Sequence, residues 1–208
     1  MIQPVILFDL DGTLLDSTEA ILLCFEDAYR DFDLIAPSRD KIKALIGHPL
    51  DYMFDHLGIE ESQVWDFVDR YKFHYRKRSK QMTHFLPGAK EAIKEAATFA
   101  RLGVVTTKTG SYSIALLEHM EVMHYFEVLI GRENVTNPKP HPEPILKALH
   151  QMQIKQQSDI WMIGDTCLDA VSAKDAKIAS IGVTCGYQVT KPFYWAVYCI
   201  IPTLKGVL

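Results

Sequence analysis

The fold of this chain is decided by the stretch VILFDLDGT at residues 5–13, where an apolar run meets two carboxylates. Val5 to Phe8 form an unbroken apolar run, which is typical of a buried strand. Asp9 and Asp11 follow directly, so both carboxylates are expected at the end of that strand. Burying a carboxylate costs free energy unless a cation or a hydrogen-bond network compensates for it. The pair is therefore a candidate functional site.

The composition is that of a globular protein. The 208 residues are 48% hydrophobic and 23% charged, which is enough apolar material for a full core in one or two domains. The formal net charge of -4 gives no electrostatic reason to expect a nucleic acid or an anionic membrane as a partner. A small anionic substrate would instead need positive charge placed locally.

Cysteine usage and the lack of an export signal favour a cytoplasmic protein. We find no basic segment followed by an apolar stretch and a small-residue cleavage site, and no run of about 18 apolar residues. The cysteines lack the paired spacing of a zinc site, and we interpret them as reduced core residues rather than disulfides. They are Cys24, Cys167, Cys185 and Cys199.

From Val104 onward, short apolar runs alternate with amphipathic helical patterns. The helical patterns begin at Ser111 and Pro142 and repeat their apolar residues at helical spacing. Strands that alternate with helices predict an α/β fold with a doubly wound, Rossmann-like parallel sheet and right-handed crossovers. The strand-like runs lie at residues 104–106, 128–130, 160–163 and 178–183.

The segment from residue 15 to residue 85 breaks this rhythm, because it contains helical patterns and no convincing strand. One helix is expected to begin at Ser17, a second to run from Ser38 to Gly47, and a third to begin near Val64. We therefore predict an inserted α-helical cap, after which Pro87-Gly88 restarts the core. The predicted domains are an α/β core at 1–14 and 86–208 and a helical cap at 15–85.

The third predicted helix carries two further features. Its aromatic stripe of Trp65, Tyr71 and Tyr75 fits a packing face better than a binding site. Its basic residues are interpreted as a solvated face that matches the helix dipole, with phosphate steering as the alternative. They are Arg70, Lys72, Arg76, Lys77, Arg78 and Lys80.

Polar residues follow three of the predicted strands. In an open α/β sheet, ligands bind beyond the carboxyl ends of the strands, so these residues are expected to converge at one edge. Carboxylates gathered there would repel one another unless a cation lies among them, and Mg²⁺ is a hard cation that prefers oxygen ligands. The residues are Asp9 and Asp11, then Thr106, Thr107 and Lys108, then Asp165 and, one helical turn on, Asp169.

Phosphoryl transfer through a covalent aspartyl intermediate requires such a set. One carboxylate attacks phosphorus, and a second protonates the leaving oxygen and later deprotonates the attacking water. Donors and positive charge must meet the transferring oxygens. Lys139 lies between Pro138 and Pro140 on a stiff loop, where its ammonium group can be aimed.

The chain resembles the haloacid dehalogenase-like (HAD) superfamily of phosphohydrolases, and within it the phosphoglycolate phosphatase-like branch with a helical cap. The resemblance covers nearly the whole chain. Four motifs occur in the family's order, and together they are far more specific than any one alone. They are Asp9-Leu10-Asp11-Gly12-Thr13, Val104-Val105-Thr106-Thr107-Lys108, Lys139-Pro140 and Gly164-Asp165-Thr166-Cys167-Leu168-Asp169-Ala170.

This resemblance implies a role for each matching residue. Asp9 would be the nucleophile and Asp11 the general acid and base, whereas similar ATPases place threonine at the latter position. Thr106 would bind the phosphoryl group, and Lys139 would neutralise charge between it and the nucleophile. Mg²⁺ would be held by Asp9, the backbone carbonyl of Asp11, and Asp165, while Asp169 would support the metal site or orient Lys139.

Substrate contacts are assigned to Thr106, Gly12, Thr107, Lys108 and His48. Thr107 departs from the family, in which asparagine often stands at this position. His48 lies where related caps carry a substrate loop, although a surface histidine after a helix end is an equal alternative. The implied substrate is a small phosphorylated metabolite, either phosphoglycolate-like or a sugar phosphate.

Several alternatives remain open at this point. A phosphosugar mutase similar to β-phosphoglucomutase would use the same core residues, and a non-catalytic binding protein could use the same scaffold. Asp165 could be only the N-cap of the helix that starts near Cys167, and Asp169 only a first-turn residue favoured by the dipole. We expect a monomer or dimer, and we expect part of the apolar segment 194–208 to pack on the sheet edge.

Overall fold

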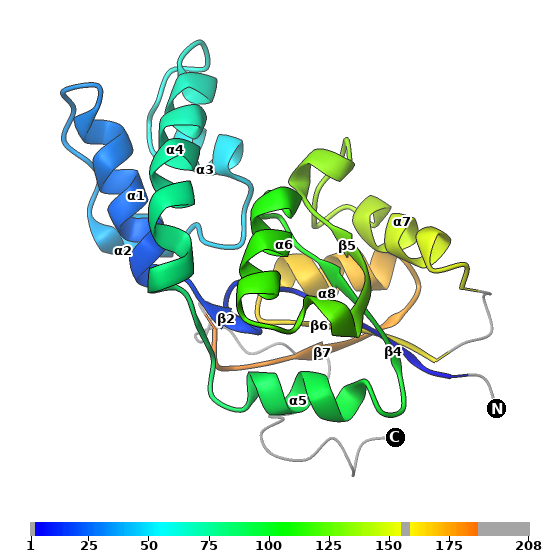
Figure 1. Ribbon diagram of the computed structural model, residues 1–208. Helices are drawn as coiled ribbons and strands as arrows, with labels where there is room; N and C mark the ends of the chain where they lie inside the picture. The colour runs from blue at the N-terminus through cyan, green and yellow to red at the C-terminus, as the bar shows by residue number, and fades with distance from the viewer. Residues whose placement is uncertain (1–2, 155–158, 187–208) are drawn as a thin grey trace. The chain divides into compact units, whose positions relative to one another are not determined.

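The structure is a computed structural model that describes residues 3–154 and 159–186 (Figure 1). The chain forms two compact units. The core unit consists of residues 1–16 and 85–208, and the helical unit consists of residues 17–84. The predicted packing of residues 194–208 on the sheet edge falls outside the described residues, as does Cys199.

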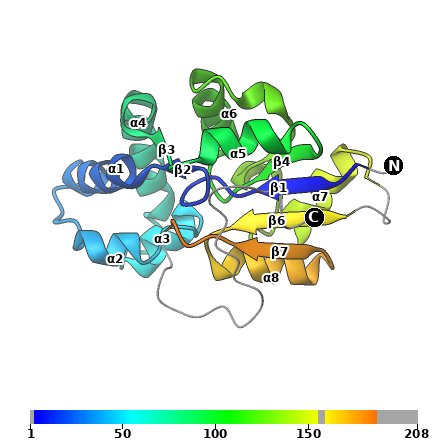
Figure 2. The same cartoon turned by 90° about the horizontal axis from the view of Figure 1, so that it is seen from below.

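The core unit is built on a parallel sheet of five strands within the described residues. The strand order is β5-β4-β1-β6-β7, and every neighbouring pair is parallel (Figures 1 and 2). The predicted doubly wound α/β fold is thereby confirmed. The strands are β1 (Val5–Phe8), β4 (Arg101–Val105), β5 (Phe126–Ile130), β6 (Ile160–Gly164) and β7 (Ala179–Gly182).

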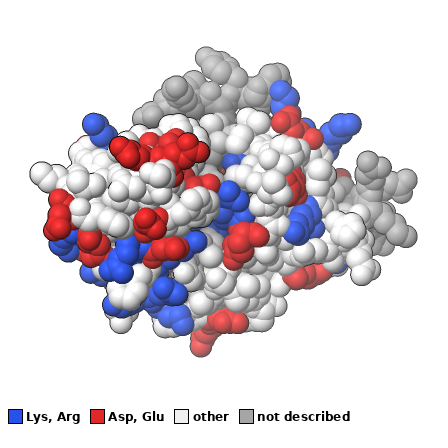
Figure 3. Space-filling model, turned by 90° about the horizontal axis from the view of Figure 1, so that it is seen from above, with Lys and Arg blue, Asp and Glu red and all other residues white. Residues whose placement is uncertain are grey.

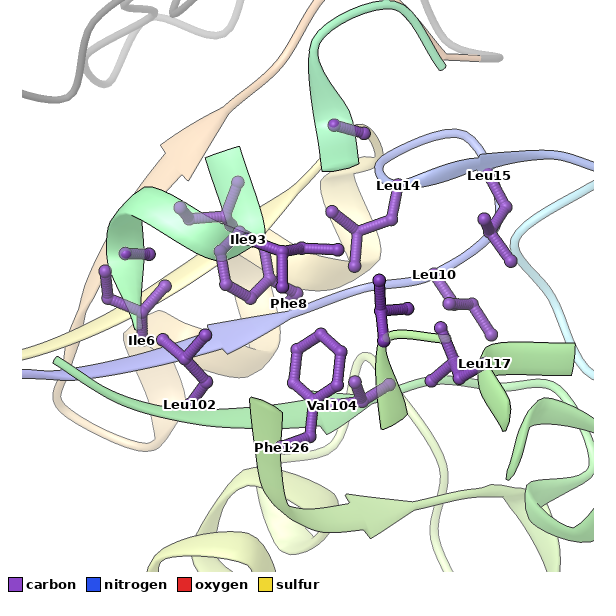
Figure 4. Packing of buried hydrophobic residues seen from close by; sticks show 14 of the residues in the cluster. Ile6, Phe8, Leu10, Leu14, Leu15, Ile93, Leu102, Val104, Leu117 and Phe126 are labelled. Atoms are coloured by element: carbon purple, nitrogen blue, oxygen red, sulfur yellow. The ribbon is translucent and has the colours of Figure 1, made fainter. Parts of the chain in front are cut away.

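Side chains of β1 alternate between the two faces of the sheet, as the pleat of a strand requires. Ile6 and Phe8 pack on one face with residues of α5 and α6, and Figure 4 shows Ile93 of α5 close to Phe8. Val5 and Leu7 pack on the other face with residues of α7 and α8. The strand is therefore apolar throughout because helices cover both faces. The helices are α5 (Ala89–Ala96), α6 (Gly110–His119), α7 (Glu143–Gln151) and α8 (Cys167–Asp175), with 3₁₀ turns η1 (Met123–Tyr125) and η2 (Arg132–Asn134).

The helical unit is held together by aromatic side chains. The ring centroids of Phe25 and Phe54 are 4.5 Å apart, and those of Phe25 and Tyr71 are 5.1 Å apart. Phe67 packs on Phe54 at 5.5 Å, so three helices contribute to one aromatic cluster. The helices of this unit are α1 (Thr18–Arg30), α2 (Arg39–Lys43), α3 (Leu50–His56) and α4 (Val64–Met82).

Two short strands correct the expectation that residues 15–85 contain none. β2 (Leu15–Asp16) and β3 (His84–Phe85) pair into a two-stranded sheet. A strand of two residues is too short to show an alternating pattern. Such strands are therefore visible only through their pairing, which the sequence does not reveal.

Helix boundaries in the helical unit also differ from those predicted. α2 ends at Lys43 rather than at Gly47, and α3, which begins after Pro49, was not expected at all. Gly47 has φ = 108°, a backbone conformation that favours glycine, so this glycine lies in the turn between α2 and α3. Short helices such as these give little periodicity to detect.

The interpretation of Trp65 as a packing residue is wrong. Its side chain is 57% exposed, whereas Tyr71 and Tyr75 are buried as expected. The buried face of α4 also includes Val64 and Val68, at the spacing of three and four residues that defines one helix face. Trp65 stands one residue, or about 100°, away from that face.

Cysteine burial is more varied than expected. Cys24 is buried and Cys185 half-buried, but Cys167 is exposed at the start of α8, so its interpretation as a core residue is wrong. Among the described cysteines there is no disulfide.

Some of the basic residues of α4 form ion pairs with carboxylates of the helical unit. The Arg70 guanidinium lies 2.5 Å from the Asp31 carboxylate, and Arg78 pairs with Asp27. Figure 3 shows Lys and Arg interspersed with Asp and Glu over one face of the protein.

Among the helices that the structure describes, none is both long and apolar enough to cross a membrane.

Candidate active site

The strand order brings the predicted site residues of the core unit to one edge of the sheet. β1 lies between β4 and β6, so the residues that follow these three strands are neighbours at their carboxyl ends (Figure 2). The ladder continues past β1, because the Asp9 amide donates to the Ile163 carbonyl at 2.8 Å. The Thr106 amide likewise donates to the Ile130 carbonyl at 2.9 Å. The backbone that carries these side chains is therefore held by the sheet itself.

Three carboxylates are buried together at this edge. Asp9, Asp165 and Asp169 are 4%, 1% and 2% exposed, respectively. Each offers one oxygen within 4.8 Å of the others. Like charges this close, and this far from water, require compensation.

Part of that compensation comes from Lys139, which is itself 3% exposed. Its Nζ lies 2.8 Å from Asp9 Oδ1 and 2.5 Å from Asp169 Oδ1, and it donates to the Val105 carbonyl at 3.0 Å. The lysine is thus held by groups from three separate segments. Its loop is anchored by the Glu143 carboxylate at the start of α7, which accepts hydrogen bonds from the amides of residues 136 and 137 at 2.9 Å.

Asp169 is fixed in turn by the start of α8. Its Oδ2 accepts hydrogen bonds from the Thr166 amide at 3.1 Å and the Thr166 hydroxyl at 2.7 Å. Thr166 is the N-cap, so the alternative reading of Asp165 as the N-cap is wrong. Asp165 instead accepts a hydrogen bond from the Thr13 hydroxyl at 3.2 Å. These bonds leave the carboxylates facing one another with little freedom to rotate.

The electrostatics of the cluster show that one positive charge is not enough. Burial raises the pKa of Asp9 to about 8; Lys139 opposes this rise, whereas Asp169 and Asp165 add to it. Burial lowers the pKa of Lys139, but Asp169 and Asp9 outweigh this effect and keep it above its usual value. Three carboxylates around one ammonium would carry an excess of two negative charges. The oxygen donors and this charge excess fit a divalent cation such as Mg²⁺.

Asp11 lies beside this cluster and has a different partner. Its Oδ2 is 2.7 Å from the Nζ of Lys108 at the end of β4. Its Oδ1 is buried and has no hydrogen-bond partner among the described residues. Thr106 is 5% exposed, and its hydroxyl accepts a hydrogen bond from the Lys108 amide at 3.2 Å. Gly12 turns the chain after Asp11 with φ = 85°.

Two predicted residues, Thr107 and His48, are not among the contacts described above. Thr107 is half-buried between Thr106 and Lys108. His48 belongs to the helical unit, where its ring stacks on Tyr52 with centroids 4.2 Å apart. Burial, and to a smaller extent His56, lowers the pKa of His48. Its assignment to substrate binding stays a prediction.

Several residues that support this site are not predicted from the sequence. Thr166 could have been found from its spacing to Asp169, which is that of a capping box. Thr13 stands in the first motif, but nothing local shows that it reaches Asp165. Gly186 gave no signal, although a side chain there would collide with the Asp165 carboxylate and the Gly12 carbonyl.

Gly164 provides a test of how tightly this edge is packed. A Cβ atom at residue 164 would lie well inside van der Waals distance of the Asp169 carboxyl carbon, whereas one at Gly182 would meet nothing within 4 Å. The two glycines pair across β6 and β7. We expect Gly164→Ala to lower the free energy of unfolding by about 1–3 kcal/mol in urea denaturation, since overpacking forces neighbours to shift. Gly182→Ala is the matched control, and equal stability of the two variants would contradict this description.

Comparisons with known proteins agree with this arrangement. The sequence profile of the haloacid dehalogenase-like hydrolase family matches residues 6–183. A protein from Dickeya dadantii named probable phosphatase IndB is 35% identical over 195 residues, covering 90% of this chain and 84% of that protein. The phosphoglycolate phosphatase of Escherichia coli is 28% identical over 208 residues, covering 87% of this chain and 81% of the enzyme.

A solved structure agrees as well. A haloacid dehalogenase-like family hydrolase from Streptococcus pneumoniae superposes with a TM-score of 0.78 at 26% identity, covering 89% of this chain and 86% of that one. By these matches the chain belongs to the haloacid dehalogenase-like hydrolase family and is an enzyme of its phosphatase type, similar to the phosphoglycolate phosphatases.

Proposed function

We propose that the protein is a Mg²⁺-dependent phosphatase that hydrolyses a small phosphomonoester through an aspartyl-phosphate intermediate. One observation carries the proposal. Asp9, at the carboxyl end of β1, is buried 2.8 Å from Lys139 and within a cluster of two further carboxylates. A buried carboxylate held by a cation, with a second carboxylate two residues on, has the parts that covalent phosphoryl transfer needs.

In the first step, an oxygen of Asp9 forms a bond to phosphorus. The bond between phosphorus and the ester oxygen breaks, and its electron pair goes to the leaving oxygen. Asp11 gives its proton to that oxygen, so an alcohol departs and Asp11 becomes a carboxylate. The products of this step are the free alcohol and phosphorylated Asp9.

In the second step, a water molecule attacks phosphorus and gives a proton to Asp11. The bond between phosphorus and the Asp9 oxygen breaks, which releases phosphate and restores the Asp9 carboxylate. Asp11 is again protonated. The two carboxylates thus end the cycle in the states in which they began.

The neighbouring residues act on charge and position. Lys139 neutralises charge between Asp9 and the phosphoryl oxygens, and Asp169 keeps its ammonium in place. The Thr106 hydroxyl binds a phosphoryl oxygen. Asp9, Asp165 and the backbone carbonyl of Asp11 would hold Mg²⁺, which would supply positive charge to the transferring group.

The helical insertion acts as a cap in this proposal. The cap is predicted at residues 15–85, a segment that contains the helical unit of residues 17–84. It would exclude water while Asp9 is phosphorylated and would supply substrate contacts, among them His48. The substrate is a phosphoglycolate-like compound or a sugar phosphate. The cytoplasmic location and the monomeric or dimeric state stay predictions.

Cation binding should release a proton at neutral pH. Because the pKa of Asp9 without a cation is raised to about 8, this carboxyl is mostly protonated at pH 6.5. A bound cation requires the carboxylate, so affinity for Mg²⁺ should rise with pH, by at most about tenfold per pH unit, and level off above pH 8. Calorimetry in buffers of different ionisation enthalpy measures the proton count. Asp9→Asn should abolish the release, and a parent protein that releases no proton at pH 6.5 would contradict the description.

The function itself is tested by a screen of phosphorylated metabolites. The purified protein is incubated with each compound and Mg²⁺, and both free phosphate and isomerised sugar phosphate are measured. Release of phosphate with a clear preference for one small phosphomonoester is expected. Formation of an isomer without release of phosphate would identify a phosphosugar mutase instead. If no ester is turned over, including a generic aryl phosphate, the protein would be a non-catalytic binding protein.

A further inference from the structure

Lys108 makes a contact that neither the motifs nor the proposed mechanism uses. It follows β4, and its Nζ lies 2.7 Å from Oδ2 of Asp11, a residue 97 positions away in the sequence. The contact is sheltered, since the two side chains are 10% and 14% exposed. A pair held at this distance away from bulk water is oriented more strictly than an exposed one.

The contact divides the two oxygens of Asp11. Oδ2 accepts from the ammonium group, whereas Oδ1 is buried without a hydrogen-bond partner among the described residues. A carboxylate turns about its Cβ–Cγ bond, and one strong hydrogen bond stops this rotation. Lys108 therefore determines which oxygen of Asp11 remains available for a proton transfer.

Lys108 is also tied to the phosphate-binding position. Its backbone amide donates to the Thr106 hydroxyl at 3.2 Å, so the same residue contacts two groups of the site. The ammonium group is directed at Asp11, whereas the sequence predicts a substrate contact for Lys108. The two roles differ in what they predict for catalysis.

We propose that Lys108 is a positioning residue that holds Asp11 Oδ2, so that Asp11 Oδ1 meets the leaving oxygen and later the attacking water. This inference rests on the proposed function. It assigns Lys108 an effect on the proton transfers and none on recognition of the rest of the substrate. The effect must therefore depend on how much the leaving group needs a proton.

The leaving group provides the first test. An alkoxide is a poor leaving group and needs the proton of Asp11, whereas 4-nitrophenolate departs without one, and kcat/KM reports only the steps up to this departure. We expect Lys108→Met to lower kcat/KM for an alkyl phosphate by about 30-fold or more, because a positioned general acid contributes about 10²–10⁴-fold. For 4-nitrophenyl phosphate the loss in kcat/KM should stay below about threefold.

Two further variants separate positioning from damage to the fold. Lys108→Arg keeps a cationic donor and should recover most of the lost kcat/KM for the alkyl phosphate. Lys174→Met removes a lysine that is exposed on α8 and should change neither substrate's kcat/KM. Circular dichroism of each variant verifies that it is folded.

A double-mutant cycle provides the second test. If Lys108 acts through Asp11, adding Lys108→Met to Asp11→Asn should lower alkyl phosphate turnover by less than about threefold further. Equal losses for alkyl and aryl phosphates, or additive losses in the cycle, would overturn the inference and leave the phosphatase intact. A parent protein without phosphate release would overturn the proposed function and this inference together.

Discussion

Replacing Asp9 with Asn should lower kcat for every phosphate ester by about 10³-fold or more, because an amide cannot form the covalent bond to phosphorus. Asn has nearly the same shape as Asp and removes one negative charge from an acidic cluster. The variant should therefore fold at least as stably as the parent, and its loss of turnover cannot be attributed to unfolding. Phosphate release from an aryl phosphate with Mg²⁺ measures the effect.

A matched control variant and a second measurement test whether the loss of turnover is specific to Asp9. Asp175→Asn changes an exposed carboxylate at the end of α8 in the same unit and should leave turnover unchanged. If the parent protein is denatured in acid while it turns over a substrate labelled on its phosphoryl group, the label should remain covalently bound to the protein. The Asp9→Asn variant should retain no label. If Asp9→Asn kept more than about a tenth of the parent rate, Asp9 would not be the nucleophile.

Removing the Lys139 ammonium should have the largest effect on stability. Lys139→Met leaves the buried Asp9 and Asp169 without the cation that lies 2.8 and 2.5 Å from them. Removing one partner of a buried ion pair costs about 3–5 kcal/mol in the free energy of unfolding. Turnover should also fall by about 10²-fold or more, since the phosphoryl oxygens lose a fixed positive charge.

The pH dependence of this stability loss identifies its cause. Lys139 lowers the pKa of Asp9, so without it the carboxyl is protonated over a wider pH range and the repulsion disappears in acid. Asp9 is already protonated in both folded proteins at pH 5 to 7, so the difference in stability between parent and Lys139→Met should stay nearly constant over that range. It should grow as the pH rises from 7 to 9, where the parent's Asp9 ionises beside Lys139, measured by urea denaturation. Lys139→Arg keeps the charge and should lose less stability than Lys139→Met. A stability difference that does not change with pH would indicate lost packing rather than lost charge.

Some of the site could be predicted because its information is local. The apolar run of β1 ends at Asp9, and the run of β6 ends near Asp165. A parallel sheet brings the ends of its strands to one edge, so the convergence of these residues follows from the strand pattern alone. The cation requirement follows from the same reasoning, since carboxylates that meet at one edge repel each other.

Other features depended on contacts between distant residues and left no local trace. α6 begins at Gly110 rather than at Ser111, because the Glu133 carboxylate accepts hydrogen bonds from both amides at 2.8 and 3.2 Å. β2 and β3 exist only as each other's partner. Their formation depends on pairing, whereas propensity within two residues carries almost no information.

The sequence by itself determined the order along the chain of the parallel-sheet strands and of the helices that cover them, the four motifs and the residue types that meet at the sheet edge. Only the tertiary structure decided which of these residues are partners. Lys139 contacts Asp169, Lys108 contacts Asp11, and Thr13 contacts Asp165 across 30, 97 and 152 residues, respectively. Periodicity is a property of neighbours along the chain, whereas these contacts depend on the lateral order of the strands, which the packing of helices on both faces of the sheet establishes.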